Sequence, residues 1–177
     1  MSTIEAQRTI PAGKYAADRA HSSVEFTIAH MDISTIRGSF LTFEASLDGG
    51  DQPHISGVIE TGSADTHDET RDGHLKSPDF FDVERFPTAS FSGSLVAPDR
   101  VAGELTLRGV TRPVEMTATV TGPAVDPWGN DRVGIELEGS VDRHDFGVSW
   151  NIDLPNGGKL LDDTVTLIAS LSFVKQA

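Results

Sequence analysis

The feature that most constrains the fold of this chain is the alternation of apolar and polar residues along most of its length. It is clearest at residues 114–120, where Val114, Met116, Ala118 and Val120 alternate with glutamate and threonine. Successive side chains of a β-strand point to opposite faces, so a strand with one buried face shows a period of two. The recurrence of this period predicts an all-β protein.

The alternation divides the chain into eight or nine expected strands. It is strong at residues 24–28, 90–95, 104–107, 114–120, 133–141 and 165–173, and weaker at residues 14–18, 40–47 and 55–62. Antiparallel strands in this number, joined by hairpin-length connections, form either a sandwich or a barrel. The pattern alone does not choose between these two architectures.

Two observations favour a barrel. Several of the expected strands exceed eight residues in length. Small residues also recur on the apolar faces, where a packed sandwich core needs bulk, whereas small inward residues leave a lumen or let a strand bend. These small residues are Gly57, Gly93, Ala118, Gly139 and Ala169.

The segment SADTHDETRDGHLKSPDFFD, at residues 63–82, breaks the alternation and predicts one short helix after the fourth strand. Thr66 and Glu69 have the spacing of a capping box, which places the start of the helix at Thr66. Pro78 disfavours helical geometry at the residue before it, so the helix should end near Lys76. The charged helix leads directly into Phe80 and Phe81, an order that is typical of a plug or rim over an apolar interior.

Composition limits the classes of protein to which the chain can belong. Its 177 residues fit a single domain spanning 1–177, in which we expect residues 1–12 to be a flexible tail. The net charge of −13 opposes binding to nucleic acid and to anionic membranes. No stretch approaches the ~20 apolar residues of a membrane span, so stable membrane insertion is not expected. The N-terminus lacks an apolar run after basic residues, which predicts no signal peptide and a cytoplasmic location.

No residue pattern indicates catalysis, a cofactor or a metal site. The chain has no cysteine, which excludes thiolate chemistry, and its six histidines lack the spacing of zinc ligands. Asp18, His21 and Ser22 suggest a hydrolytic triad, but triad residues rarely converge from five consecutive positions. We therefore interpret Asp18 and Ser22 as caps of backbone groups in a turn. We expect a protein that is not an enzyme and that needs no cofactor.

Four separated segments carry a family resemblance. They read DRAHSSVEF at residues 18–26, RDGHLKSPDFFD at residues 71–82, GELTLRGVTRPV at residues 103–114 and DRHDFG at residues 142–147. In this order they resemble the signatures of the YceI-like polyisoprenoid-binding family, over residues from about 14 to 174. The resemblance implies a lipocalin-like antiparallel β-barrel that holds a long isoprenoid or another aliphatic chain. Many members of that family are exported, whereas we expect this chain to be cytoplasmic.

The resemblance and the apolar pattern together predict a binding site for a long-chain lipid, a polyisoprenoid or its pyrophosphate. Phe80, Phe81, Phe146 and Trp150 lie near loops, where the mouth of a pocket would be lined. The loop at residues 154–160, rich in proline and glycine, suits a mobile lid or rim. The predicted ligand-binding residues are Phe26, Ile28, Phe43, Arg71, His74, Phe80, Phe81, Phe91, Met116, Ile135, Arg143, Phe146, Trp150 and Leu167.

The polar residues of this set have two interpretations. Arg71, Asp72, Arg143 and His144 form either an ion-pair network that holds the helix to the barrel, or a donor site for an anionic head group. A guanidinium suits phosphate or carboxylate well. A pyrophosphate would need such a local cluster, because the overall field of the protein repels it. The sequence leaves this choice open.

Two other functions remain as alternatives to a lipid carrier. One is an enzyme that acts on a small apolar or acyl substrate in the same cavity, with His74 or His144 as base. The other is a filled barrel that serves as an interaction module. The sequence also leaves open the chain length of the ligand and whether the protein is a homodimer.

Overall fold

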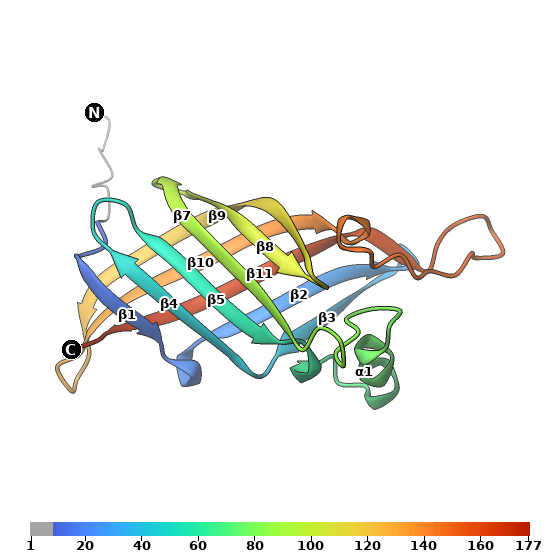
Figure 1. The fold of residues 1–177 in the computed structure, drawn as a ribbon, viewed down its shortest axis with the longest axis horizontal. Helices are drawn as coiled ribbons and strands as arrows, with labels where there is room; N and C mark the ends of the chain where they lie inside the picture. The colour runs from blue at the N-terminus through green and yellow to red at the C-terminus, as the bar shows by residue number, and fades with distance from the viewer. Residues whose placement is uncertain (1–8) are drawn as a thin grey trace.

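The alternating segments form one antiparallel sheet that closes on itself (Figure 1). The computed structural model describes residues 9–177. Closure occurs at β1, which pairs with β4 on one side and with β11 on the other. The strands are β1 (Gly13–Ala17), β2 (Ser23–His30), β3 (Ser34–Phe40), β4 (Phe43–Gly49), β5 (His54–Glu60), β6 (Ala64–Asp65), β7 (Thr88–Ala97), β8 (Arg100–Leu107), β9 (Val110–Val125), β10 (Asp131–Asp142) and β11 (Leu161–Lys175).

The barrel has eight sides, as the sequence predicted, although several sides consist of two strands. β1 and β2 both pair along β11, and the short 3-10 helix η1 (Arg19–His21) lies between them. β3 and β4 likewise continue one another, with β3 beside β2 and β4 beside β1. The predicted antiparallel β-barrel with one short helix is therefore confirmed as a fold.

Two strands, β3 and the two-residue β6, were not predicted from the sequence. The inward residues of β3 are Ile36, Gly38 and Phe40, and the glycine in the middle hides the alternation. Gly38 is small because the ring of Phe26, on the neighbouring strand, lies over it. A Cβ atom at Gly38 would come within 2.4 Å of Phe26 Cζ. With the additional strands counted, the helix follows β6 and not the fourth strand.

The helix α1 (Glu69–Lys76) begins later than predicted. Asp68 caps it, since its Oδ1 accepts a hydrogen bond of 2.8 Å from the backbone N–H of Arg71. The predicted capping box at Thr66 was wrong, because the Thr66 hydroxyl bonds to Asp72, at 2.6 Å. The end of the helix at Lys76 agrees with the prediction from Pro78, and Ser77 is the C-cap residue.

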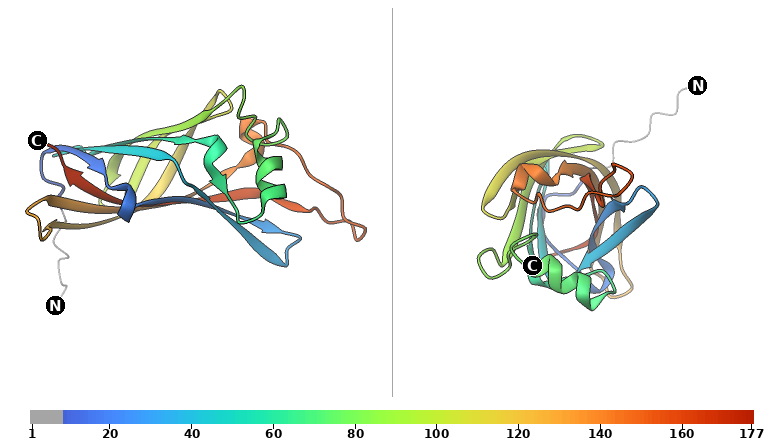
Figure 2. Two further views of the ribbon diagram at one scale, coloured as in Figure 1. Left: turned by 90° about the horizontal axis from the view of Figure 1, so that it is seen from below. Right: turned by 90° about the vertical axis from the view of Figure 1, so that its right-hand side faces the viewer.

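The two ends of the barrel differ. The end that holds the C-terminus is filled by buried side chains: Ile10, Tyr15, Leu47, Val101, Val133, Ile135 and Phe173. Residues 1–8 of the expected tail lie outside the described residues, but Ile10 is already packed in this core. The opposite end carries α1, the β2–β3 turn and the long connection from β10 to β11 (Figure 2).

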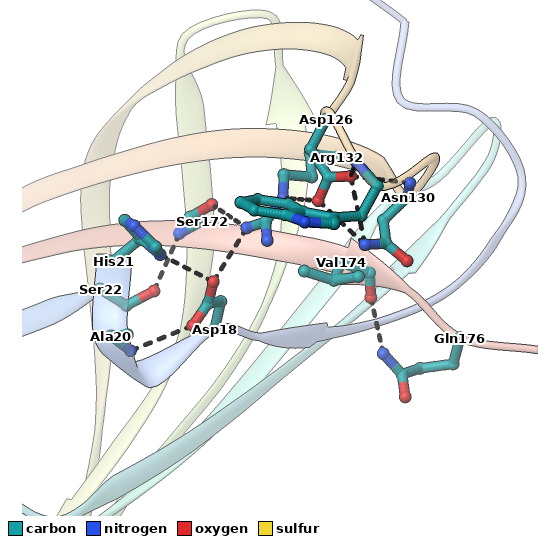
Figure 3. Close-up of polar contacts among 11 residues, drawn as sticks. Asp18, Ala20, His21, Ser22, Asp126, Asn130, Arg132, Ser172, Val174 and Gln176 are labelled. Carbon is teal, nitrogen blue, oxygen red and sulfur yellow. Dashed lines mark hydrogen bonds and ion pairs between the residues drawn. The ribbon is translucent and has the colours of Figure 1, made fainter.

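An ion-pair network fastens the filled end (Figure 3). Arg132 Nε donates to Asp126 at 2.8 Å, and Arg132 Nη1 donates to Asp18 at 3.0 Å. Asp18 also contacts His21 at 2.8 Å and caps the backbone N–H of Ala20. The hydrogen bond from His21, followed by that from Arg132, lowers the pKa of Asp18. The predicted role of Asp18 as a cap of a backbone group is confirmed. The whole cluster fastens the ends of the strands at this end of the barrel.

Candidate functional site

A cavity of about 550 Å³ occupies the half of the barrel nearest α1. Its wall is largely apolar and comes from the inward faces of β2, β4, β5, β7 and β11. Several inward residues at this level are small, and they leave space between the larger ones. The small residues include Ala45, Gly57, Ala89 and Ala169, which all line the cavity.

Gly57 shows how this space arises. It lies opposite Ala45 on β4 and Phe91 on β7, on the inward face of β5. A Cβ atom at Gly57 would lie 3.3 Å from the Glu44 carbonyl oxygen and 3.7 Å from the Ala45 Cβ, and no atom from the lumen side is among its nearest neighbours. A larger side chain at this position would therefore extend into the lumen.

The other small residues singled out in the sequence do not create lumen. A Cβ atom at Gly93 would lie 2.7 Å from the ring of Phe91, and one at Gly139 would lie 2.9 Å from Met116. Both glycines thus accommodate a neighbouring side chain. Ala118 is buried in the core of the barrel. The interpretation that small inward residues leave a lumen therefore holds only at Gly57 and Ala169 among these five.

A cluster of three phenylalanines closes the cavity beneath α1. The ring of Phe26 on β2 lies 5.4 Å from Phe40 on β3, measured between centroids. Phe81, which follows the helix, meets Phe40 at 5.7 Å and Phe26 at 6.4 Å, both in edge-to-face arrangements. Such pairs stabilise packing beyond the area that they bury. They hold the segment after α1 against the barrel wall.

A second aromatic cluster joins α1 to the connection between β10 and β11. His74 on the helix lies edge-on to Phe80 at 4.9 Å and to Trp150 at 4.6 Å. Phe80 and Trp150 also contact each other at 5.5 Å. His74 Nε2 is fixed by Asp79 Oδ2 at 2.8 Å. These residues cover the mouth of the cavity from two sides.

Arg71 is held by Thr66, which lies just before the start of α1. Its Nε donates to the Thr66 hydroxyl and its Nη2 to the Thr66 carbonyl, both at 2.7 Å. Asp72 in turn accepts hydrogen bonds from the Thr66 N–H and hydroxyl. This series of hydrogen bonds orders the segment that leads into α1, at the edge of the cavity.

Arg143 holds a different element. It belongs to the 3-10 helix η3 (Arg143–Phe146), and only 4% of its surface is exposed. Its Nε donates to the Asp162 carbonyl at 2.9 Å, and its Nη1 donates to the carbonyls of Val148 and Trp150 at 2.9 and 2.8 Å. Burial lowers the pKa of this guanidinium. Arg143 therefore fixes the path of the connection that carries Trp150.

The remaining members of the charged cluster do not join these two arginines into one network. His144 Nε2 contacts Asp163 at 2.7 Å on the outer surface. Arg143 Nη2 makes no hydrogen bond and lies 3.8 Å from the same carboxylate. Among the contacts of residues 9–177, Arg71 and Arg143 thus secure two separate segments.

The structure brings nearly all of the predicted ligand-binding residues to the cavity wall. Ile135 is the exception, since it is packed in the core of the filled half. Their role in binding stays a prediction. The cavity residues that sequence analysis missed are mostly small or aliphatic strand residues, whose alternation was the available signal. They include Val24, Ile36, Phe40, Ala45, Ile55, Ile59, Leu75, Ala89, Leu105, Leu137, Val141 and Val165.

Residues 9–177 contain no group of three His, Asp or Glu side chains placed to hold a metal ion. No helix in this part of the chain has the length and apolar character needed to span a membrane.

Comparisons with known proteins agree with the geometry. A family model described as the YceI-like domain matches residues 15–173. The UPF0312 protein SA2479 of Staphylococcus aureus is 32% identical over 164 residues, which cover 90% of this chain and 96% of the relative.

Solved structures show the same fold. The Campylobacter jejuni YCEI protein superposes with a TM-score of 0.68 at 24% identity, over 85% of this chain and 91% of that one. A domain from Saccharophagus degradans superposes with a TM-score of 0.71 at 14% identity, over 94% and 100% of the two chains. That domain is described as polyisoprenoid binding and as implicated in plant cell wall breakdown.

Proposed function

Because this chain belongs to the YceI-like family, we propose that it binds one long apolar lipid chain, of the polyisoprenoid class, inside the barrel. The observation that carries the proposal is the cavity of about 550 Å³ with its largely apolar wall. This volume lies within the range of about 300–1,000 Å³ that is usual for small-molecule sites. The description of the Saccharophagus degradans domain supports the choice of ligand class.

Burial of the ligand would supply most of the binding free energy. Each methylene group transferred from water into an apolar site contributes about 0.8 kcal/mol. The small residues Gly57 on β5 and Ala169 on β11 leave space for a chain, and the rings of Phe26, Phe81 and Phe91 border it. Selectivity would then follow from the width and depth of the lumen.

The contacts of the two histidines support a carrier more than an enzyme. His74 is bonded to Asp79 and enclosed by Phe80 and Trp150, while His144 is bonded to Asp163 outside the cavity. Within residues 9–177, the imidazole of neither histidine is hydrogen-bonded to a serine or threonine hydroxyl that it could activate as a nucleophile. We therefore propose that the ligand enters and leaves chemically unchanged.

Native mass spectrometry of the purified protein tests this function. The proposal predicts a bound species of constant mass, at one copy per chain, that organic extraction identifies as an apolar lipid. A barrel that carries no lipid, and that takes none up when a prenyl alcohol is added, would overturn it. Consumption of the added alcohol with release of a new product would favour the enzymatic alternative.

A further inference from the structure

Three exposed aliphatic side chains lie at the end of the barrel that carries α1, opposite the filled end. We call this the open end. Ile33 ends the β2–β3 turn and is 82% exposed, Ile152 in the β10–β11 connection is 50% exposed, and Met31 in the β2–β3 turn is 39% exposed. We call Met31, Ile33 and Ile152 the rim patch. Isolated apolar residues are normal on a surface, but several on neighbouring loops beside an apolar opening mark an interaction site.

Backbone hydrogen bonds place the members of the rim patch on adjoining segments. The N–H of Met31 donates to the Leu160 carbonyl at 2.8 Å, and the N–H of Leu160 donates to the Ile152 carbonyl at 2.9 Å. Leu160, together with His30 before the turn, lines the cavity. The rim patch is therefore continuous with the mouth, at the end where the turn and the connection project (Figure 2).

The backbone of the turn adds an independent observation. Met31 and Asp32 both have φ of 56°, in a two-residue hairpin closed by the hydrogen bond from Ile33 to His30. This conformation favours asparagine and glycine. A methionine there is unfavourable for the turn itself, which is consistent with a side chain selected for what it contacts outside the protein.

We propose that the rim patch docks the open end of the barrel onto the surface of an electrically neutral lipid bilayer, where the ligand of the proposed function is taken up or delivered. This inference rests on the proposed function, because a lipid that fits the cavity resides in membranes. The aliphatic patch lacks the exposed tryptophan, tyrosine and arginine side chains that dominate protein–protein contacts. Aliphatic loop residues inserting at the bilayer interface gain apolar burial.

Charge decides which kind of bilayer fits. The protein carries a net charge of −13, and Asp32 lies between two members of the rim patch. Asp153 beside Ile152 is paired with Lys159, so that pair adds little charge. An anionic surface would repel this end of the molecule, whereas a zwitterionic surface would not. Asp32 also keeps the contact shallow, since its carboxylate must stay at the level of the head groups.

The test compares the parent protein with the double variant Ile33→Ser, Ile152→Ser. The matched control is Val125→Ser, which removes a side chain of 67% exposure at the opposite end of the barrel. Flotation with phosphatidylcholine vesicles measures docking, and a pyrene-labelled long-chain alcohol measures transfer from vesicles and uptake from solution. We expect the double variant to lose vesicle binding and transfer rate by about tenfold, equivalent to about 1.4 kcal/mol, with unchanged uptake from solution.

The possible results separate this inference from the proposed function. If the parent takes up the probe from solution but ignores the vesicles, or if the double variant transfers it as fast as the parent, the docking inference fails alone. If the parent binds vesicles through the rim patch but never takes up the probe, the docking surface stands and the proposed function fails. Equal loss in Val125→Ser would show that the effect is not specific to the rim patch and would overturn the inference.

Discussion

The ring of Trp150 lies edge-on against His74, with 4.6 Å between the two centroids, and this contact joins the two segments that cover the cavity mouth. His74 comes from α1, whereas Trp150 belongs to the connection that Arg143 fixes. A bulky ligand can pass between these segments only if the contact separates. The contact should therefore control the rate of release more than the stability of the barrel.

Replacement of Trp150 by alanine tests this role. Aromatic pairs contribute about 0.5–1.5 kcal/mol beyond area burial, so the variant should release ligand roughly two- to tenfold faster. Stopped-flow displacement of a fluorescent lipid measures the rate. Trp128→Ala is the matched control, because Trp128 is 82% exposed in the turn at the filled end. Unchanged release from Trp150→Ala would show that the ligand leaves by another path.

Replacement of Arg71 by glutamine distinguishes a head-group site from a structural role. Because Thr66 engages both Nε and Nη2 of Arg71, we expect prenyl pyrophosphate and prenyl alcohol to lose affinity by the same factor. Lys76→Gln, on the same helix, controls for the change in charge. Titration of both ligands into all three proteins makes the comparison. A selective loss of pyrophosphate binding, by the ~1.5–3 kcal/mol of a charge-assisted contact, would assign Arg71 to the head group.

Arg143 should matter chiefly for stability. Its guanidinium donates to three backbone carbonyls while almost fully buried. Each hydrogen bond from a charged group contributes about 1.5–3 kcal/mol, so Arg143→Gln should lower the free energy of unfolding by about 3 kcal/mol or more. Urea denaturation measures this change. Arg112→Gln, which removes an exposed side chain bonded to the neighbouring Thr111 carbonyl, should have little effect.

The filled end should weaken in acid. The hydrogen bond from Arg132, with further ones from Asn130, holds the pKa of Asp126 well below its usual range. A carboxylate with a lowered folded-state pKa stabilises the protein above its unfolded pKa of about 3.9, and this contribution disappears as the pH falls through the folded value. The stability difference between the parent and Asp126→Asn should therefore be constant near neutrality and shrink below about pH 4. Urea midpoints across this range measure it, and a constant difference down to pH 2 would contradict the assignment.

The sequence predicted most of the strands because alternation reports directly on which face of a strand is buried. It missed β3, since Gly38 replaces an apolar residue where the Phe26 ring needs room. It misplaced the start of α1, because Thr66 and Asp68 both resemble caps and only the three-dimensional contacts with Arg71 and Asp72 decide between them. Local patterns describe a residue's own segment, not its partners.

The same limit applies to the site. Most inward aromatic residues were recognised. Ile135 and Phe91, however, look alike in an alternating pattern, although Ile135 fills the core and Phe91 borders the cavity. The difference depends on the height of each residue along the barrel axis. That height follows from strand pairing, which spans residues far apart in the chain. The separate roles of Arg71 and Arg143 were hidden for the same reason.

The most direct test of the central claim is to fill the cavity from the inside. Gly57→Phe adds a ring that extends into the lumen from β5, and Ala169→Phe adds one from β11. Val96→Phe adds the same group on the outside of β7, where Val96 is 53% exposed. Calorimetric titration of the delipidated proteins with geranylgeraniol should show one site per chain in the parent and in Val96→Phe. Both inward variants should remain folded and lose affinity by at least about tenfold; undiminished binding by both of them would contradict a ligand inside the barrel.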